Sequence, residues 1–149
     1  MATEAEHEEL YRHFVEEAWN KRPPNLEICF EFFAPTHIAH SWDGDPEHDV
    51  HGPQGHFDFV TNYHKAFPDV HIDFILLVAK NDLVWAVMTA SGTFEGPYMG
   101  IPPTGKRFSI QAFGVNRIVN GQSVEAWGMV DRLGMLTQLG IIPALEPAS

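Results

Sequence analysis

The stretch RFSIQAFGVNRIVNGQSVEAWGMVD, residues 107–131, decides the fold class of this chain. Its Asn120-Gly121 pair is the strongest short hairpin signal in the sequence, because both residues tolerate the positive φ angles of a two-residue turn. β-Rich runs lie on both sides of the pair, over residues 107–119 and 123–130. We therefore expect these two runs to pair as antiparallel strands.

Outward from this hairpin, the remaining segments divide into helices first and strands second. Apolar residues recur every three to four positions in the N-terminal part, which is typical of amphipathic helices. This order predicts an α+β domain in which a curved antiparallel sheet packs on three N-terminal helices and encloses an apolar pocket. The expected helices span residues 5–20, 26–33 and 53–66, with a last helical turn or two at 133–139, and the expected strands span 37–42, 70–79, 83–94, 107–119 and 123–130.

Length and composition limit the class of protein. The chain has 149 residues, 44% of them hydrophobic, and one cysteine, so we expect a single domain, residues 1–149, that needs no disulfide to fold. Its formal net charge of −11 argues against nucleic acid or an anionic membrane as a partner. No run approaches the roughly 20 apolar residues of a membrane span, and the acidic N-terminus does not read as a signal peptide. We expect a cytoplasmic protein.

Several patterns in the chain imitate metal or nucleotide sites. All nine histidines lie within residues 7–71, which draws attention to the N-terminal half. The acidic run at residues 43–49 alternates like a calcium loop, but His48 stands where that loop requires glycine. Residues 100–106 have the spacing of a phosphate loop, but they lead into a strand, whereas a nucleotide-binding loop leads into a helix. The chain has no HExxH motif of a zinc enzyme. Cys29 is interpreted as a packed core thiol. We expect no metal and no cofactor.

A set of short motifs occurs in one order along nearly the whole chain. Together they resemble the SnoaL-like polyketide cyclase family, within the nuclear transport factor 2-like (NTF2-like) superfamily, over residues 7–143. The resemblance implies an NTF2-like cone that forms a homodimer or homotetramer. Members of the family catalyse cofactor-free aldol cyclisations of polyketides in secondary metabolism, and relatives run other isomerisations or hydrolyses. The motifs are Ala66-Phe67-Pro68-Asp69, Gly92-Thr93-Phe94, residues 100–106, Asn116-Arg117-Ile118, Glu125-Ala126-Trp127 and Gln138-Leu139-Gly140.

Asp131 is the first candidate for a catalytic residue. An unbroken two-residue hairpin would place Trp127 opposite Gly114 and Met129 opposite Ala112, with Asp131 on the same face as both. A carboxylate beside Trp127 and Met129 loses hydration, which raises its pKa toward the range of a general acid/base. The resemblance implies the same role, because an aspartate in this motif removes the substrate's α-proton in related cyclases. The alternative is that Asp131 is the N-cap of the last helix.

Three further polar side chains are candidates for the same site. His40 occupies a position where the resembled family often has His or Asn, and a neutral imidazole there could orient the substrate or polarise a carbonyl. The alternative for His40 is a half-buried histidine bonded to the following loop. Asn116 stands where many of these cyclases have histidine, and it can donate to an enolate oxygen but cannot shuttle a proton. Gln111 could supply a second amide, although the unbroken register puts it on the face opposite Asp131 unless a bulge reverses that.

The expected wall of the pocket consists of large side chains from four segments. Trp127 and Met129 come from the last strand, Trp42 from the short first strand, Tyr63 from the third helix and Met99 from the Pro-rich loop. Glycines flank Met99 and permit lid movement. The alternatives are that Trp42 belongs to the core and that the Met99 loop is a rigid connection contributing a dimer contact.

These observations lead to one functional hypothesis and two alternatives. The hypothesis is a small cofactor-independent enzyme of the lyase or isomerase class, which performs an aldol-type cyclisation or isomerisation on an apolar, carbonyl-bearing substrate. The first alternative is a noncatalytic module of the same fold that binds a hydrophobic ligand or dimerises. The second is a hydrolase in which Asp131 activates a water molecule. The expected partners are a small hydrophobic molecule and further copies of the chain.

Overall fold

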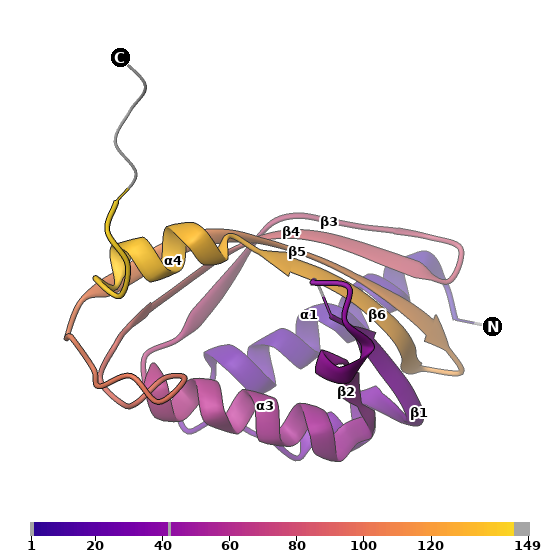
Figure 1. The fold of residues 1–149 in the computed structure, drawn as a ribbon. Coiled ribbons are helices and arrows are strands. Elements are labelled where there is room, and N and C mark those ends of the chain that lie inside the picture. The colour runs from indigo at the N-terminus through magenta and orange to yellow at the C-terminus, as the bar shows by residue number, and fades with distance from the viewer. Residues whose placement is uncertain (1, 42, 145–149) are drawn as a thin grey trace.

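The computed structural model describes residues 2–41 and 43–144, which form a curved sheet over a layer of helices (Figure 1). The expected α+β class and curved sheet are confirmed. The helices are α1 (Glu4–Val15), α2 (Ile28–Phe32), α3 (Gly52–Ala66) and α4 (Arg132–Gln138), with a π-helical turn at Glu16–Asn20 and a 3₁₀ turn at Pro46–His48. The strands are β1 (Phe33–His40), β2 (Val50–His51), β3 (His71–Lys80), β4 (Leu83–Thr93), β5 (Arg107–Val119) and β6 (Gln122–Val130).

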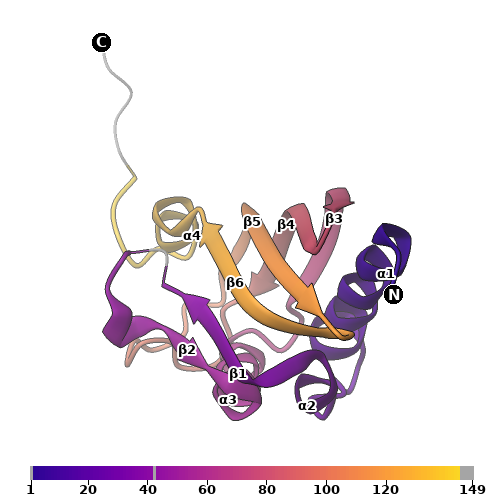
Figure 2. The same ribbon diagram turned by 90° about the vertical axis from the view of Figure 1, so that its right-hand side faces the viewer.

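The strands form one six-stranded sheet in the order β2-β1-β6-β5-β4-β3. All neighbours are antiparallel except β1 and β6, which are parallel and join the first part of the chain to the last. Helices α1 and α3 lie against one face of the sheet, whereas α4 lies at the far end of β6 (Figures 1 and 2). We call the face toward α1 and α3 the inner face and the opposite one the outer face.

Helix α1 begins where the sequence predicts and ends earlier than expected. Thr3 is its N-cap, with a side chain that accepts a hydrogen bond from the Glu6 backbone N–H at 3.1 Å. The expected helix at 5–20 divides into α1 and the π-helical turn. Asn20 closes that turn, because its amide donates to the Ile72 carbonyl and accepts from the Ile72 N–H, both at 2.8 Å. This pair of bonds ties the end of the helix to β3.

Strand β1 starts four residues before the expected 37–42 segment. Phe33 and Ala34 are buried, so the strand gains apolar contacts by beginning there. Pro35 cannot donate a ladder hydrogen bond, and the β1–β6 pairing is irregular between Phe33 and Ile38, where a proline is tolerated. The predicted wall residue Trp42 lies outside the described residues.

The hairpin turn between β5 and β6 forms as predicted. Asn120 and Gly121 have φ angles of 51° and 76°, as a two-residue turn of this type requires. Val119 pairs with Gln122 across the turn.

The register of the hairpin changes soon after the turn. Ile118 pairs with Ser123, but Arg117 pairs with Glu125, so Val124 is an extra residue in β6. This is a β-bulge, and a shift of one residue turns every later side chain of β6 to the other face of the sheet.

The bulge overturns the unbroken register on which the Asp131 argument rested. Trp127 pairs with Val115 and Met129 pairs with Phe113, so the expected small partners are wrong. Both side chains therefore share the outer face with Phe113. The sequence contains no signal for the extra residue, because the bulge has no glycine and alternation alone continues through it.

Two apolar clusters hold the inner face against the helices. One joins α1 and α2 to the centre of β4 and β5, and the other joins the end of α3 to α4. Phe67 is the centre of the second cluster, with its ring 5.0 Å from Phe108, and a Cβ at Gly92 would lie 3.1 Å from the Phe67 Cβ.

Cys29 is fully buried, and burial raises its pKa to about 12, in agreement with a core thiol. No helix of the described segments is both long and apolar enough to cross a membrane.

Candidate functional site

A cavity of about 1090 Å³ lies between the inner face of the sheet and helices α1 and α3. Sites for small molecules typically measure roughly 300–1,000 Å³ and are mostly apolar. Aromatic and aliphatic side chains from the helices, together with small residues of β5, form most of the wall. The polar side chains among its lining residues are Tyr11, His40, Ser41, Asp43, His48, His56, Asn62, Tyr63, Lys65, Tyr98, Asn116 and Arg132.

Tyr11 and Asn116 form a hydrogen-bonded pair inside the cavity. The Asn116 Oδ1 accepts from the Ser123 hydroxyl at 2.7 Å, which directs the amide nitrogen toward the Tyr11 oxygen. Burial raises the pKa of Tyr11 to about 12, and the hydrogen bond from Asn116 opposes that rise. The phenol therefore stays protonated at neutral pH, and its hydroxyl donates a weak hydrogen bond to the Met88 sulfur at 3.9 Å. Gly114 makes room for it, because a Cβ there would lie 2.9 Å from the Tyr11 oxygen.

The prediction that Asn116 lies in the site agrees with this geometry, but the sequence argument missed Tyr11. Tyr11 lies in the apolar stripe of its helix, with Leu10 and Phe14, and a position in that stripe indicates packing. The available signal was a hydroxyl-bearing residue in a stripe that is otherwise purely apolar. Nothing in the sequence indicates that Asn116 faces Tyr11, because the two residues lie far apart in the chain.

A second buried polar pair lies between β1 and α3. His56 Nε2 is 3.0 Å from His37 Nδ1, and the His56 ring stacks on Phe33 with centroids 3.7 Å apart. Burial lowers the pKa of His37 to about 4 and that of His56 to about 3, so both rings are neutral at pH 7. His56 lines the cavity. Among the described residues, His37 Nε2 has no hydrogen-bond partner.

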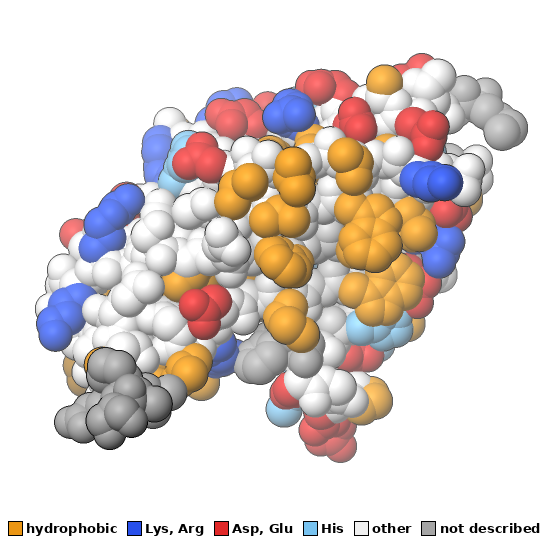
Figure 3. Space-filling model, turned by 90° about the horizontal axis from the view of Figure 1, so that it is seen from above, with side chains coloured by type: hydrophobic (Ala, Val, Ile, Leu, Met, Phe, Trp, Pro, Cys, Tyr) orange, Lys and Arg blue, Asp and Glu red, His pale blue; other side chains and the backbone are white. Residues whose placement is uncertain are grey.

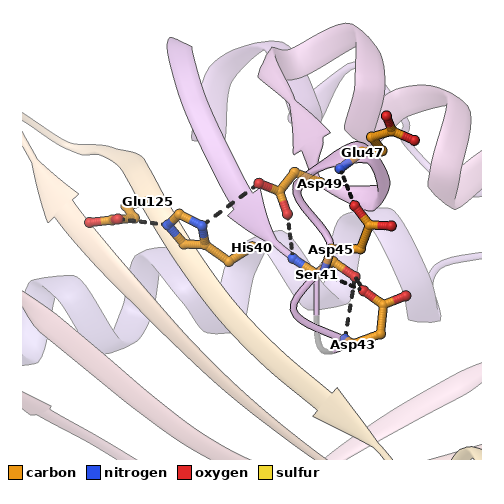
Figure 4. A network of polar contacts seen from close by, with 7 residues as sticks. All are labelled: His40, Ser41, Asp43, Asp45, Glu47, Asp49 and Glu125. Atoms are coloured by element: carbon orange, nitrogen blue, oxygen red, sulfur yellow. Dashed lines mark hydrogen bonds and ion pairs between the residues drawn. The ribbon is translucent and has the colours of Figure 1, made fainter.

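His40 lies at the end of β1, on the rim of the cavity, between two carboxylates (Figure 4). Its Nε2 is 2.7 Å from Glu125 Oε2, and its Nδ1 is 3.9 Å from Asp49 Oδ2, which is too long for a hydrogen bond. The imidazole stacks on Trp127, with centroids 5.5 Å apart. The hydrogen bond from His40, and the charge of Arg117, lower the pKa of Glu125. Glu125 is therefore ionised and orients the imidazole.

The acidic loop after β1 satisfies its own backbone groups. Asp49 accepts from the Ser41 N–H at 2.7 Å, Asp43 from the Asp45 N–H at 2.9 Å, and Asp45 from the Glu47 N–H at 3.0 Å (Figure 4). Within the described residues, no group of three or more His, Cys, Asp or Glu side chains is placed to hold a metal ion.

The structure places Asp131 at the start of α4 rather than in the cavity. Its carboxylate accepts a hydrogen bond from the Gly134 N–H at 2.9 Å, which is the N-cap arrangement of the alternative reading. The side chain is exposed and, with Gln111, lines a separate hollow of about 600 Å³ on the outer face. The bulge thus brings Gln111 and Asp131 to one face. A catalytic role for Asp131 stays a prediction with no contact in the cavity to support it.

Trp127 and Met129 contribute to the rim of the cavity but not to its interior. The register turns their side chains to the outer face, where they are 39% and 59% exposed. Their atoms reach the cavity where β6 approaches the loop after β1.

Tyr63 and Met99 line the other end of the cavity, as predicted. The hydroxyl groups of Tyr63 and Tyr98 are 3.3 Å apart, and burial raises the pKa of Tyr63. Arg132 contacts the sulfur of Met99 and joins α4 to this loop. The loop therefore lies across the cavity, with contacts to α3 through Tyr63 and Ala66 and to α4 through Arg132.

Known proteins show both sequence and fold similarity to this chain. A family model described as SnoaL-like polyketide cyclase matches residues 9–139. The aklanonic acid methyl ester cyclase DnrD of Streptomyces peucetius is 31% identical over 114 residues, which cover 76% of this chain and 74% of the relative. The corresponding cyclase DauD of Streptomyces sp. strain C5 is also 31% identical, over 76% of this chain and 67% of the relative.

Solved structures extend the similarity to the fold. AclR of Streptomyces galilaeus, a candidate hydroxylase, superposes with a TM-score of 0.81 at 28% identity, covering 97% of this chain and 87% of that one. TsrD of Streptomyces laurentii superposes with a TM-score of 0.81 at 25% identity, covering 95% of this chain and 100% of TsrD. A protein from Jannaschia sp. CCS1 shares the fold, with a TM-score of 0.82 at 20% identity. The superposition covers 96% of this chain and 97% of that protein. One fold thus hosts proteins described in different terms, so the reaction must be argued from the site.

Proposed function

This chain belongs to the SnoaL-like polyketide cyclase family, and from that premise we propose that it is a cyclase or isomerase that acts without a cofactor on an apolar, carbonyl-bearing substrate. The observation that supports this most directly is the Tyr11 hydroxyl, held as a donor by Asn116 inside a large apolar cavity. An apolar cavity favours a hydrophobic substrate, and a hydroxyl donor held in one orientation favours binding of a substrate oxygen beside it.

In an aldol-type reaction, a base first removes a proton from a carbon next to a carbonyl group. The resulting enolate carbon attacks a second carbonyl carbon, and the alkoxide then takes up a proton, so the product has the composition of the substrate. Tyr11 donates a hydrogen bond to the oxygen on which negative charge develops. Asn116 acts as a positioning residue, because both ends of its amide are already bonded within the protein.

We assign the proton transfer to His40. Its Nε2 is bonded to Glu125 at 2.7 Å, its Nδ1 lies 3.9 Å from Asp49 Oδ2, and His40 is among the residues that line the cavity. A histidine oriented by a carboxylate is a common arrangement for a general base. Asp131 has no place in this scheme because its carboxylate caps α4.

The test is an assay with aklanonic acid methyl ester, the compound in the names of the two cyclase relatives. Product of unchanged mass and altered chromatographic retention is the expected result. His40→Gln, which keeps a polar side chain of similar reach, should lower kcat by about 10²-fold or more while the chain stays folded. Full activity of His40→Gln would remove His40 from the mechanism.

A second candidate function is ligand binding without turnover. It is favoured by the position of His40 between two carboxylates and by the absence of Asp131 from the cavity lining. A calorimetric titration separates the two functions, because binding of the same ester without any conversion supports the noncatalytic module. Conversion of the ester supports the enzyme.

A further inference from the structure

Two phenol groups meet at the end of the cavity where α3 stops. Tyr63 lies near the end of α3, Tyr98 lies on the loop between β4 and β5, and both line the cavity. Figure 1 shows that loop beside the C-terminal end of α3. The two hydroxyl oxygens are 3.3 Å apart, and either hydroxyl can donate to the other. We call these two residues the tyrosine pair.

The tyrosine pair has one hydroxyl proton more than its own hydrogen bond uses. Each phenol carries one proton, and the bond between the two oxygens engages one of them. Within the described part of the chain, neither hydroxyl bonds to any further group. Burial raises the pKa of Tyr63, so its hydroxyl keeps its proton at neutral pH. One O–H of the pair is therefore left to donate to a ligand.

Aromatic rings surround the Tyr63 side chain. The centroid of its ring lies 5.0 Å from that of Phe59, 5.7 Å from that of Trp19 and 5.9 Å from that of Phe67. A hydrogen bond in such apolar surroundings is electrostatically stronger than one in water. The tyrosine pair therefore selects the group that it binds, while the rings contact the apolar part of the same ligand.

Two cationic side chains lie at the same end of the cavity. Lys65 follows Tyr63 by two residues on α3, Arg132 is the first residue of α4, and both line the cavity. Arg132 contacts the sulfur of Met99, the residue after Tyr98. Its positive charge opposes the rise in the pKa of Tyr63 that burial causes. Arg132 is therefore close enough to act on whatever the tyrosine pair binds.

The acidic side chain of the cavity wall belongs to a different segment. Among the described residues that line the cavity, Asp43 is the one carboxylate, and it accepts a hydrogen bond from His48 at 2.6 Å. The loop with these two residues precedes α3, whereas Tyr63 and Lys65 lie at the far end of that 15-residue helix, which is roughly 20 Å long. The end of the cavity with the tyrosine pair thus combines hydrogen-bond donors with positive charge.

We propose that the tyrosine pair, Lys65 and Arg132 form a subsite for a carboxylate group on the apolar ligand of the cavity. All four side chains can donate, and a carboxylate offers two accepting oxygens and a charge that the two cations compensate. A doubly charged phosphate would cost more to bring into apolar surroundings. The two cyclase relatives are named for a methyl ester, in which this charge is absent.

This inference deepens the proposed function and rests on it for one point, that the ligand occupies this cavity. It adds that the ligand carries a free carboxylate besides its carbonyl group. Apolar side chains also gather on the outer face of the sheet, where an apolar ligand could bind as well (Figure 3). Variants of Tyr63 and Arg132 separate the two places, because both residues line the cavity.

The test is a calorimetric titration of the full chain near pH 7.5, where carboxylic acids are ionised. The ligands are aklanonic acid and its methyl ester, which differ in the carboxylate alone, and anthraquinone-2-carboxylate with its methyl ester as a smaller pair. We expect each acid to bind about 10-fold more tightly than its ester or better. Tyr63→Phe and Arg132→Met should each weaken binding of the acids about 10-fold and change binding of the esters less than about 3-fold.

Lys80→Met is the matched control for charge. Lys80 is exposed at the end of β3 and does not line the cavity, so its loss changes the net charge as Arg132→Met does without touching the subsite. It should keep the wild-type preference for the acids. Circular dichroism checks that every variant is folded. Lys65→Met, at an exposed position, replaces Arg132→Met if that variant does not fold.

Three results would overturn the proposal: equal affinity for acid and ester, failure of both acids to bind, and an acid preference that Tyr63→Phe and Arg132→Met leave intact. The titrations need no turnover, so they are independent of the reaction. Conversion of the ester by a chain that binds acid and ester alike would refute the subsite and leave the proposed function standing. Acid preference without any conversion would support the subsite and count against the enzyme.

Discussion

The hydroxyl of Tyr11 is a donor because three neighbours fix its surroundings. Ser123 holds the Asn116 amide by its oxygen, and the amide nitrogen then faces Tyr11. Gly114 leaves the space that the phenol occupies. Each of the three neighbours is an ordinary strand residue in the sequence, and only their convergence gives them a role.

Tyr11→Phe removes this donor and keeps the aromatic ring. We expect kcat to fall by about 10²-fold, as for the loss of one donor to a developing negative charge. The buried Asn116 nitrogen loses its partner, so the free energy of unfolding should fall by about 1–3 kcal/mol in urea titrations. Ser123→Ala keeps the Tyr11 hydroxyl but removes the hydrogen bond that holds the Asn116 amide. It should lower kcat less than Tyr11→Phe does. Equal activity of both variants and the wild type would contradict the assignment.

Asp131 is the residue for which sequence and structure lead to different expectations. Asp131→Ala should lower the free energy of unfolding by about 1 kcal/mol, because the N-cap of α4 is lost. Asp131→Asn retains an acceptor and should change that free energy by only a few tenths of a kcal/mol. Because the carboxylate lies outside the cavity, Asp131→Asn should keep most of the turnover. Loss of turnover without loss of stability would return Asp131 to the mechanism.

At the scale of elements, β1 and α3 are joined by two histidines that are neutral in the folded chain. The folded pKa values of about 4 for His37 and about 3 for His56 lie below the ordinary value near 6.5. Below pH 6.5 the unfolded chain therefore binds more protons than the folded one. Stability from this pair is fully present above pH 6.5 and is lost as the pH falls toward 4 and 3.

A His37→Gln/His56→Gln double variant tests this linkage. Each histidine adds up to about 1.4 kcal/mol per pH unit to the slope of unfolding free energy against pH between pH 6 and 4.5. Urea titrations across that range should give a steeper slope for the wild type than for the double variant. Comparing slopes removes any constant cost of the substitutions. Equal slopes would show that the histidines are not buried as a neutral pair.

Element positions were largely predictable, because hydrophobic period and breakers act locally. The Asn120-Gly121 turn and the strands around it formed as predicted. Strand β1 was placed too late, since its start depends on burial of Phe33 against other elements. The bulge at Val124 was not predictable from the sequence. The turn alone favours an unbroken register, whereas the packing of both sheet faces decides which side chains of β6 point inward.

At the scale of the whole molecule, the net charge of −11 acts against association of copies of the chain, whereas exposed apolar side chains such as Phe113 and Met129 on the outer face of the sheet favour it. Raising salt from about 0.1 M to about 1 M shortens the Debye length from about 10 to about 3 Å and screens this repulsion. We therefore expect association between copies of the chain, which the family resemblance implies, to tighten with salt, measured by sedimentation equilibrium. Weakening with salt would indicate an interface held by ion pairs instead.

The sequence by itself determined the α+β class, the hairpin turn and the family, because these depend on local pattern and on ordered motifs. Tertiary structure alone decided which face each side chain of β6 occupies. One extra residue in a strand moves Trp127 and Met129 outward and leaves Asp131 to cap α4. Packing between α1 and β5 brings Tyr11 against Asn116. Periodicity gives the alternation of a strand, but the starting phase is set by packing between distant segments.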